Sequence, residues 1–260
     1  MEQPAVVVRG LTRTFGDVVA VQGIDLTVES GRFFGFLGPN GAGKSTTIKM
    51  LTGLLAPTSG TIQIAGFDLA TQGIEAKRLI GVVPEGMALF GRLTGFEYLR
   101  FVGRMYGMPA TQASERAEEL LQFMQLSDEP NKLVTDYSHG MQRKLALAAA
   151  VIHGPRILFL DEPFEGVDAV AAGTLKKMLL KMIDGGVTIF LTTHVLEIVE
   201  ALCSHVAIID KGSLVASGSI EELRRGVTRA DGERLTLEQI FIRIVGAENA
   251  VSTKELSWLR

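Results

Sequence analysis

The sequence predicts an α/β fold with a mainly parallel β-sheet, an N-terminal antiparallel β flap and an inserted helical subdomain. Short β-branched or aromatic runs recur between helical patterns, and such near-continuous apolar strands suit a parallel sheet that is buried on both faces. We expect these strands at residues 33–37, 80–83, 157–160, 187–191 and 206–209. A chain of 260 residues is long enough to bury a substantial apolar core around such a sheet.

Two strand patterns that follow each other directly predict the N-terminal flap. They cover residues 5–8 and 18–28, and the turn-like sequence Phe15-Gly-Asp17 lies between them. Strands joined by a short turn pair in an antiparallel arrangement. We therefore expect a small antiparallel unit ahead of the parallel sheet.

Strand patterns disappear between residues 97 and 152, and helical patterns replace them. One of these patterns places five apolar residues on a single helical face: Ala113, Ala117, Leu120, Leu121 and Met124. The sequence therefore predicts a helical insertion over about residues 86–155.

Two short helical patterns follow residue 218. They cover residues 220–225 and 235–245, and the polar stretch 228–234 separates them. The segment that contains these two patterns is too short for a domain of its own. We expect one domain over residues 1–223 and a short C-terminal helical appendage over residues 224–260.

Composition excludes several classes of protein. The formal net charge of -3 argues against a surface that binds nucleic acid over the whole chain, so no nucleic-acid partner is expected. The single cysteine, Cys203, cannot form an internal disulfide, which fits a reducing compartment. The first residues lack a secretory signal pattern, and apolar runs such as 145–152 are shorter than the roughly 20 residues that cross a bilayer. We expect a cytoplasmic protein that reaches a membrane only through a partner.

A glycine-rich loop lies between the strand at 33–37 and a helical pattern at 46–54. It reads Gly-Pro-Asn-Gly-Ala-Gly-Lys-Ser and matches a glycine, four residues and then Gly-Lys-Ser. The glycines let backbone N–H groups point at phosphates, and the following helix presents its positive end to the same anion. Lys44 adds a positive charge, and Ser45 can bring its hydroxyl to Mg²⁺.

The alternative interpretation of this loop is a helix cap that binds nothing, and the correct strand and helix flanks argue against it. The loop predicts a P-loop NTPase core with a site for ATP and Mg²⁺. The expected ATP-binding residues form one continuous segment: Gly38, Pro39, Asn40, Gly41, Ala42, Gly43, Lys44, Ser45 and Thr46.

Two carboxylates follow the apolar strand at 157–160. Asp161 and Glu162 leave that strand at its carboxyl end, where open α/β sheets bind their ligands. We expect Asp161 to hold the Mg²⁺ shell and Glu162 to polarise the attacking water. An acidic turn is the alternative, and the nearby phosphate loop makes it the weaker one.

The order of these motifs, over about residues 6–223, resembles the ATPase subunit of an ABC transporter. Tyr137-Ser-His-Gly-Met141, followed by Gln-Arg-Lys144, resembles the signature motif of that family, commonly LSGGQ. The resemblance implies that Ser138, His139, Gly140 and Met141 act on the ATP of a partner subunit. Ser138 is also well placed as an ordinary helix cap, which is the alternative interpretation.

The resemblance extends to three further positions. His194 resembles the switch histidine, which contacts the γ-phosphate and helps to hold the attacking water, so we expect it to be catalytic together with Glu162. Asp168 ends a segment, Phe164-Glu-Gly-Val-Asp168, that resembles the loop joining two subunits, although a surface turn is nearly as good an interpretation. Phe15 lies where the family places an aromatic ring against adenine, and a packed core phenylalanine is the alternative.

The chain departs from the family pattern at three positions. Glu85 stands where the family usually has glutamine, and an ionised glutamate adds negative charge beside a triphosphate. Mg²⁺ could offset that charge, so we expect Ser45, Glu85 and Asp161 around the metal. In the signature, Met141 cannot supply the hydrogen bonds of the usual glutamine, and His139 could donate to phosphate instead.

The resemblance implies a transport ATPase. Two ATP-binding subunits, identical or different, would sandwich ATP and drive integral membrane subunits through the face around residues 85–106. The segment 89–101 looks most similar to exporter-type members, and the protein would lie peripherally on the cytoplasmic face of the cell membrane. One alternative is a soluble member of the superfamily, which usually has a second cassette or a coiled-coil insertion. A second alternative is a weakly hydrolysing regulatory module, against which Glu162 and His194 argue.

Overall fold

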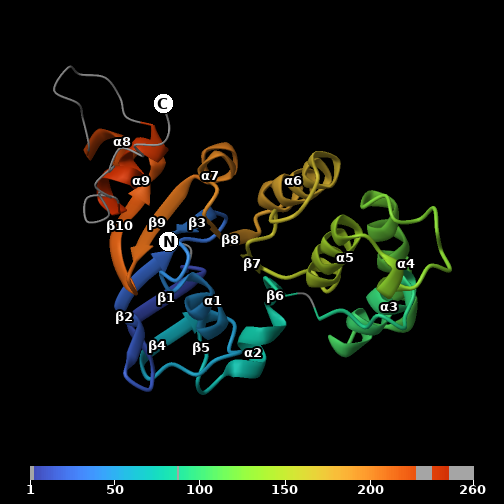
Figure 1. Ribbon diagram of the computed structural model, residues 1–260. Coiled ribbons are helices and arrows are strands. Elements are labelled where there is room, and N and C mark those ends of the chain that lie inside the picture. The colour runs from blue at the N-terminus through green and yellow to red at the C-terminus, as the bar shows by residue number, and fades with distance from the viewer. Residues whose placement is uncertain (1–2, 87, 227–235, 246–260) are drawn as a thin grey trace, which may run out of the picture.

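A computed structural model describes residues 3–86, 88–226 and 236–245 of the protein. A six-stranded sheet lies at its centre (Figure 1). Its strands are β3 (Phe33–Leu37), β6 (Ile80–Val83), β7 (Ile157–Asp161), β8 (Thr188–Thr193), β9 (His205–Asp210) and β10 (Ser213–Ser219). Their order is β10-β9-β3-β8-β7-β6. All neighbours pair in parallel except β10, which is antiparallel to β9. The predicted mainly parallel sheet is confirmed.

Two features of this sheet differ from the sequence prediction. β8 continues to Thr193, two residues beyond the apolar run at 187–191, and therefore includes Thr192. β10 was not predicted because its sequence, Ser-Leu-Val-Ala-Ser-Gly-Ser, has only a short apolar run between small polar residues and glycine. A strand at the edge of a sheet does not need to be apolar on both faces.

The N-terminal flap is confirmed and is larger than predicted. It is an antiparallel sheet of β1 (Val6–Phe15), β2 (Val18–Val28), β4 (Ser59–Ile64) and β5 (Phe67–Asp68), in the order β2-β1-β4-β5. The sequence did not reveal β4 because it begins with Ser59-Gly60-Thr61, which reads as a loop. Pairing with β1 makes this segment a strand.

Apolar layers cover both faces of the central sheet. On the face toward the flap, Phe190 packs against Phe34, Phe36 and Phe159, with ring centroids 5.5, 5.5 and 5.6 Å apart. Helices α1 (Lys44–Leu51) and α2 (Gly73–Arg78) belong to this layer. On the opposite face, Leu158, Leu160 and Leu191 pack under α6 (Ala169–Asp184) and α7 (Leu196–Leu202). Burial on both faces explains why these strands read as continuous apolar runs.

The predicted helical insertion is confirmed, and its helices lie together on one side of the molecule (Figure 1). They are α3 (Gly95–Met105), α4 (Ala110–Phe123) and α5 (His139–Val151). Of the face predicted to be apolar, Leu120 is half-buried and the other four residues are buried. A capping box starts α3, because Thr94 accepts from the Glu97 N–H and Glu97 accepts from the Thr94 N–H. This unit shares the apolar core on the α6 and α7 face of the sheet.

The C-terminal helices pack onto the domain. They are α8 (Ile220–Gly226) and α9 (Leu237–Val245), and the predicted polar stretch 228–234 lies outside the described residues. Leu237 and Ile240 are fully buried, and the Leu237 N–H donates to Glu200 on α7 at 3.1 Å. A division at residue 223 remains a prediction, and it would cut α8. Within the described ranges, no helix has the length and hydropathy needed to cross a membrane.

A half-buried histidine joins the helical subdomain to the sheet. His153 follows α5, and its ring stacks on that of Tyr106 with centroids 3.6 Å apart and planes 6° apart. Its Nε2 lies 3.0 Å from the Ile80 carbonyl, which can only accept, so Nε2 carries the proton. Burial lowers the pKa of His153 to about 4. The ring is therefore neutral at physiological pH.

Acidification should destabilise the protein through His153. The pKa of His153 is 6.5 in the unfolded chain and about 4 in the folded protein. Between these two pH values the unfolded chain binds more protons on this ring than the folded protein does. The free energy of unfolding therefore falls as the pH decreases through that window. In His153→Gln, which keeps a donor for the Ile80 carbonyl, the stability difference from wild type should narrow as the pH falls. Urea unfolding at several pH values measures this difference, and parallel curves would contradict the role of His153.

Candidate active site

The phosphate loop connects β3 to α1 as predicted. Gly43 precedes α1 with φ 106°, a value that non-glycine residues rarely adopt. A Cβ at Gly43 would lie 2.6 Å from the Ala20 carbonyl, and a Cβ at Gly38 would overlap the Ile209 carbonyl. The loop therefore packs against the flap and β9 so closely that only glycine fits at these positions. This packing fixes the loop backbone at the N-terminus of α1.

Lys44 is buried beneath the loop. Its Nζ donates to the carbonyls of Gly38 at 2.8 Å and Pro39 at 3.2 Å, and lies 3.7 Å from Oε1 of Glu162. At this distance two opposite charges attract by about 4 kcal/mol before desolvation is subtracted. A cavity of about 280 Å³ opens over these groups. Its lining residues are Ala20, Asn40, Gly41, Gly43, Lys44, Ser45, Thr46, Glu85 and Glu162.

Ser45, Glu85 and Asp161 come together at one end of α1. The Ser45 hydroxyl lies 3.3 Å from Oε2 of Glu85 and 3.3 Å from Oδ1 of Asp161. Since it has one proton, it can donate to only one of these carboxylates at a time. The cluster therefore offers more oxygen acceptors than the protein has donors, which is the ligand chemistry that Mg²⁺ prefers. The three residues predicted around a metal are brought together.

Asp161 is held by its neighbour on β8. The Thr192 hydroxyl donates to Oδ1 of Asp161, and the two residues are paired in the sheet. Burial raises the pKa of Asp161, hydrogen bonds from Thr192 and Ser45 oppose that rise, and the charges of Glu85 and Glu162 add to it. An ionised Asp161 is thus costly until a cation approaches.

Glu162 lies between Lys44 and His194. Its Oε1 is 3.0 Å from Nδ1 of His194, while its backbone N–H donates to the Thr192 carbonyl at 3.2 Å. The backbone of Glu162 has φ 47°, a left-handed conformation that costs a non-glycine residue on the order of 1 kcal/mol or more. This turn directs the carboxylate away from the strand axis and into the cavity. The pair predicted to be catalytic is therefore in direct contact.

The signature segment contacts the 164–168 loop. Ser138 caps α5 as predicted and accepts from the Met141 N–H at 3.2 Å. Nε2 of His139 lies 3.3 Å from the Glu165 carbonyl. Asp168 caps α6, and a Cβ at Gly140 would lie 3.2 Å from Oδ2 of Asp168. The sequence did not show that these two motifs pack together.

Phe15 is not a core residue. It ends β1, its ring is 46% exposed, and the Arg13 guanidinium lies 4.4 Å from the ring centroid. Among the described residues that line the cavity, none belongs to the signature segment and Phe15 is not one of them. One chain therefore brings together the phosphate, metal and hydrolysis residues and leaves the other predicted groups apart from them.

Two residues of the site were missed by the sequence analysis. Thr192 orients both carboxylates, and its position at the end of an apolar strand was the available signal. Ala20 lines the cavity from the flap. No sequence pattern marks Ala20, because a small residue on an edge strand carries no chemistry of its own.

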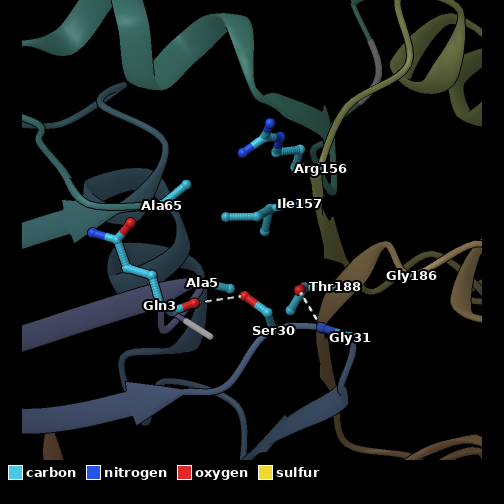
Figure 2. Close-up of a pocket in the computed structure, with 9 residues that line it drawn as sticks. All are labelled: Gln3, Ala5, Ser30, Gly31, Ala65, Arg156, Ile157, Gly186 and Thr188. Atoms are coloured by element: carbon cyan, nitrogen blue, oxygen red, sulfur yellow. Dashed lines mark hydrogen bonds between the residues drawn. The ribbon is translucent and has the colours of Figure 1, made fainter. Parts of the chain in front are cut away.

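A larger cavity, of about 410 Å³, lies at the amino-terminal ends of strands of the central sheet, away from the phosphate loop (Figure 2). It is bordered by Ile157 and Thr188, which begin β7 and β8. Ligands of open α/β sheets bind at the carboxyl ends of strands instead. Two of its polar groups are already paired, since the Ser30 hydroxyl donates to the Gln3 carbonyl at 2.8 Å and Thr188 accepts from Gly31 at 2.9 Å. We assign it no ligand.

Comparison with known proteins finds relatives of this chain over most of its length. Residues 21–165 match the family described as ABC transporter. The Nod factor export ATP-binding protein I of Cupriavidus metallidurans is 40% identical over 83% of this chain and 71% of that protein. A solved ATP binding subunit of an ABC transporter has a TM-score of 0.84 at 29% identity, over 92% of this chain and 99% of that chain. The dimeric post-hydrolysis structure of the ATP-binding cassette MJ0796 with ADP and Pi shares the fold, with a TM-score of 0.76 at 23% identity over 83% and 98%.

Asp161→Asn should stabilise the nucleotide-free protein at neutral pH. The raised pKa of Asp161 means that ionisation of this buried group opposes folding, so wild-type stability falls as the pH rises through that pKa. The amide removes this penalty, and a gain of about 1 kcal/mol would raise the melting temperature by about 2–4 °C. The gain should vanish below the ordinary Asp pKa of 3.8. Calorimetry at pH 7 and pH 3.5 measures both values, and a variant less stable than wild type at pH 7 would contradict this account.

Proposed function

The chain belongs to the ABC transporter family and is an ATPase, and from this premise we propose that two ATP-binding subunits close head to tail and drive export through separate membrane subunits. The observation that carries the proposal is the contact of Glu162 with both Lys44 and His194 over the phosphate-loop cavity. A base and a phosphate-binding cation are groups that serve hydrolysis of a γ-phosphate, and the histidine in the same contact can help to hold the water.

In this proposal each group at the cavity has one task. The N–H groups at the start of α1, together with Lys44, bind the phosphates. Glu162 accepts a proton from the attacking water, and a positioned base contributes about 10²- to 10⁴-fold to the rate. His194 is partly exposed and holds the water or the γ-phosphate from the other side. The strained backbone of Glu162 supports this assignment, since such strain clusters at functional sites.

Ser45, Glu85 and Asp161 are the residues that would hold Mg²⁺. Their oxygens already converge, and within the described residues no cluster of three or more Asp, Glu, His or Cys side chains forms a complete metal site. The remaining ligands would be phosphate and water oxygens, as is usual for Mg²⁺ bound with a nucleotide. The metal would neutralise charge on the β- and γ-phosphates. Glu85 would bind the metal at the position of the usual glutamine.

The proposed dimer completes the site from a second subunit. Ser138 and His139 are exposed at the N-terminus of α5, a position that favours an anion, whereas Gly140 beside them is buried against Asp168. Phe15 is exposed at the end of β1, where it can stack on adenine. MJ0796, which has the same fold, was solved as a dimer. Asp168 would act at the joint between the two subunits.

The helical subdomain offers a surface for the membrane subunits. Phe90, Phe101 and Met105 are exposed on or before α3, next to a cavity of about 210 Å³ lined mainly by apolar residues such as Leu89 and Val102. An exposed apolar surface of this kind marks a docking site. Export is the direction we propose, because the Nod factor relative is named for it. Attachment to such subunits would place the protein on the cytoplasmic face of the cell membrane.

Co-expression with the membrane protein of a neighbouring gene tests the transport proposal. The two proteins should copurify, and ATPase activity in vesicles should depend on the membrane subunit. Full activity without any membrane partner, together with failure to copurify, would favour a soluble ATPase instead.

Glu162→Gln should abolish turnover while preserving ATP binding. The amide cannot accept the proton of the water, so we expect a loss of about 10²-fold or more in kcat. Because the nucleotide remains uncleaved, the closed dimer should accumulate with ATP, as seen by gel filtration with light scattering. Lys44→Ala is the matched control, which should lose both nucleotide binding and dimerisation. Wild-type turnover in Glu162→Gln would refute its role as base.

Glu85→Gln should change the Mg²⁺ dependence of hydrolysis. Removing one carboxylate from the metal cluster weakens Mg²⁺ binding, so half-maximal activity should require about tenfold more free Mg²⁺, the lower end of the effect of losing an outer-shell partner of a metal. Titration of Mg²⁺ at fixed ATP measures this shift, with Glu75→Gln on the exposed surface of α2 as the control. Identical Mg²⁺ curves, with and without the membrane partner, would exclude Glu85 from the metal site.

A further inference from the structure

Arg143 is a buried cation to which the proposed mechanism assigns no task. It lies on α5, the helix that Ser138 caps, and is only 3% exposed. Its Nη1 donates to the Pro84 carbonyl at 3.4 Å, and its Nε is buried without a partner. Within the described part of the chain it forms no ion pair. A buried guanidinium with incomplete hydrogen bonding is costly, so its surroundings must compensate its charge.

Four carboxylates supply that compensation. Burial lowers the pKa of Arg143, and the charges of Glu165, Glu85, Asp161 and Glu162 oppose this in decreasing order. Arginine remains charged in proteins, so the positive charge is permanent. Three of these carboxylates belong to the ATP site. Arg143 therefore contributes to the electrostatic balance of that site without lining its cavity.

The contact with Pro84 places this charge at the segment that carries Glu85. Pro84 is the residue immediately before Glu85, so the Arg143 guanidinium is hydrogen-bonded to the same short segment of backbone. Glu165 has the larger electrostatic effect, but Arg143 makes no hydrogen bond to its loop. Glu85 is also the position where this chain carries an acid in place of the usual glutamine. A permanent cation beside it offsets the charge that the glutamate adds.

We propose that Arg143 is a positioning residue for Glu85, which holds the Pro84-Glu85 segment and balances its carboxylate so that a triphosphate can bind beside it. The proposal rests on the place of Glu85 at the proposed ATP site. Arg143 belongs to the helical subdomain, whereas Glu85 follows β6 of the central sheet. The pair therefore links the orientation of the signature helix to the charge that faces the nucleotide.

Binding of a fluorescent ATP analogue tests the proposal without requiring turnover. In Arg143→Gln, the uncompensated Glu85 should repel the phosphates, so we expect about fivefold weaker binding in EDTA and a smaller loss, about twofold, at saturating Mg²⁺. Adding Glu85→Gln to this variant should restore the affinity to within about twofold of Glu85→Gln alone. An equal loss in both backgrounds, or a loss independent of Mg²⁺, would overturn the proposal.

Three further variants separate this role from a structural one. Arg116→Gln removes a similar bond, from a guanidinium to the Ile152 carbonyl at 2.8 Å in the same subdomain, and should leave nucleotide affinity unchanged. Arg143→Lys keeps the charge and should bind within about twofold of wild type. If Glu165→Gln, rather than Glu85→Gln, rescues Arg143→Gln, then Glu165 is the partner and the proposal is wrong.

Folding and the underlying function are controlled separately. Circular dichroism establishes that each variant is folded, and if Arg143→Gln alone is not, Arg143→Lys and the double variant with Glu85→Gln carry the test. Both should then fold and bind the analogue, and failure of both would refute the proposal. Should Glu85→Gln alone leave the Mg²⁺ dependence unaltered, the metal role of Glu85 fails, whereas rescue of Arg143→Gln would still establish the charge pair.

Discussion

The parallel register between β7 and β8 is the constraint on which the active site depends. It pairs Asp161 with Thr192, so that the Thr192 hydroxyl donates to the carboxylate of Asp161. The carbonyl of the same threonine accepts from the backbone N–H of Glu162. One residue on β8 thus orients both carboxylates, and β8 then ends next to His194. A shift of one residue in this register would turn every side chain to the opposite face of the sheet.

The site concentrates negative charge before any ligand arrives. Glu85 and Glu162 line the cavity together with Lys44, Asp161 contacts Ser45 beside it, and burial raises the pKa of Asp161. Such a site is less stable than a neutral one, and a cation that binds only the folded state would stabilise it by mass action. The left-handed backbone of Glu162 also lowers the stability of the folded protein, while it holds the carboxylate in position before ATP binds. Arg143 supplies a permanent positive charge from the neighbouring helical subdomain.

Parts of the fold whose pattern is local were predicted well. The parallel strands are buried on both faces and read as apolar runs, and the phosphate loop combines glycines with Lys44 and Ser45. The strand β4 was missed because Ser59 and Gly60 look like a loop until they pair with β1. Phe15 could have been a core residue by sequence alone, and its 46% exposure decided otherwise. The contact of His139 with the Glu165 carbonyl joins segments 26 residues apart, which no local pattern shows.

The sequence by itself determined that this chain is an α/β ATPase of the ABC type, with a phosphate loop, two acidic residues after a strand and a histidine after another. These features depend on residue type and spacing, which can be read directly from the sequence. Only the tertiary structure decided which of these residues lie in contact. Ser45 lies between Glu85 and Asp161, Glu162 lies between Lys44 and His194, and Arg143 reaches Pro84. Such meetings are set by strand order and helix packing, because residues distant in the chain become neighbours only when the sheet forms.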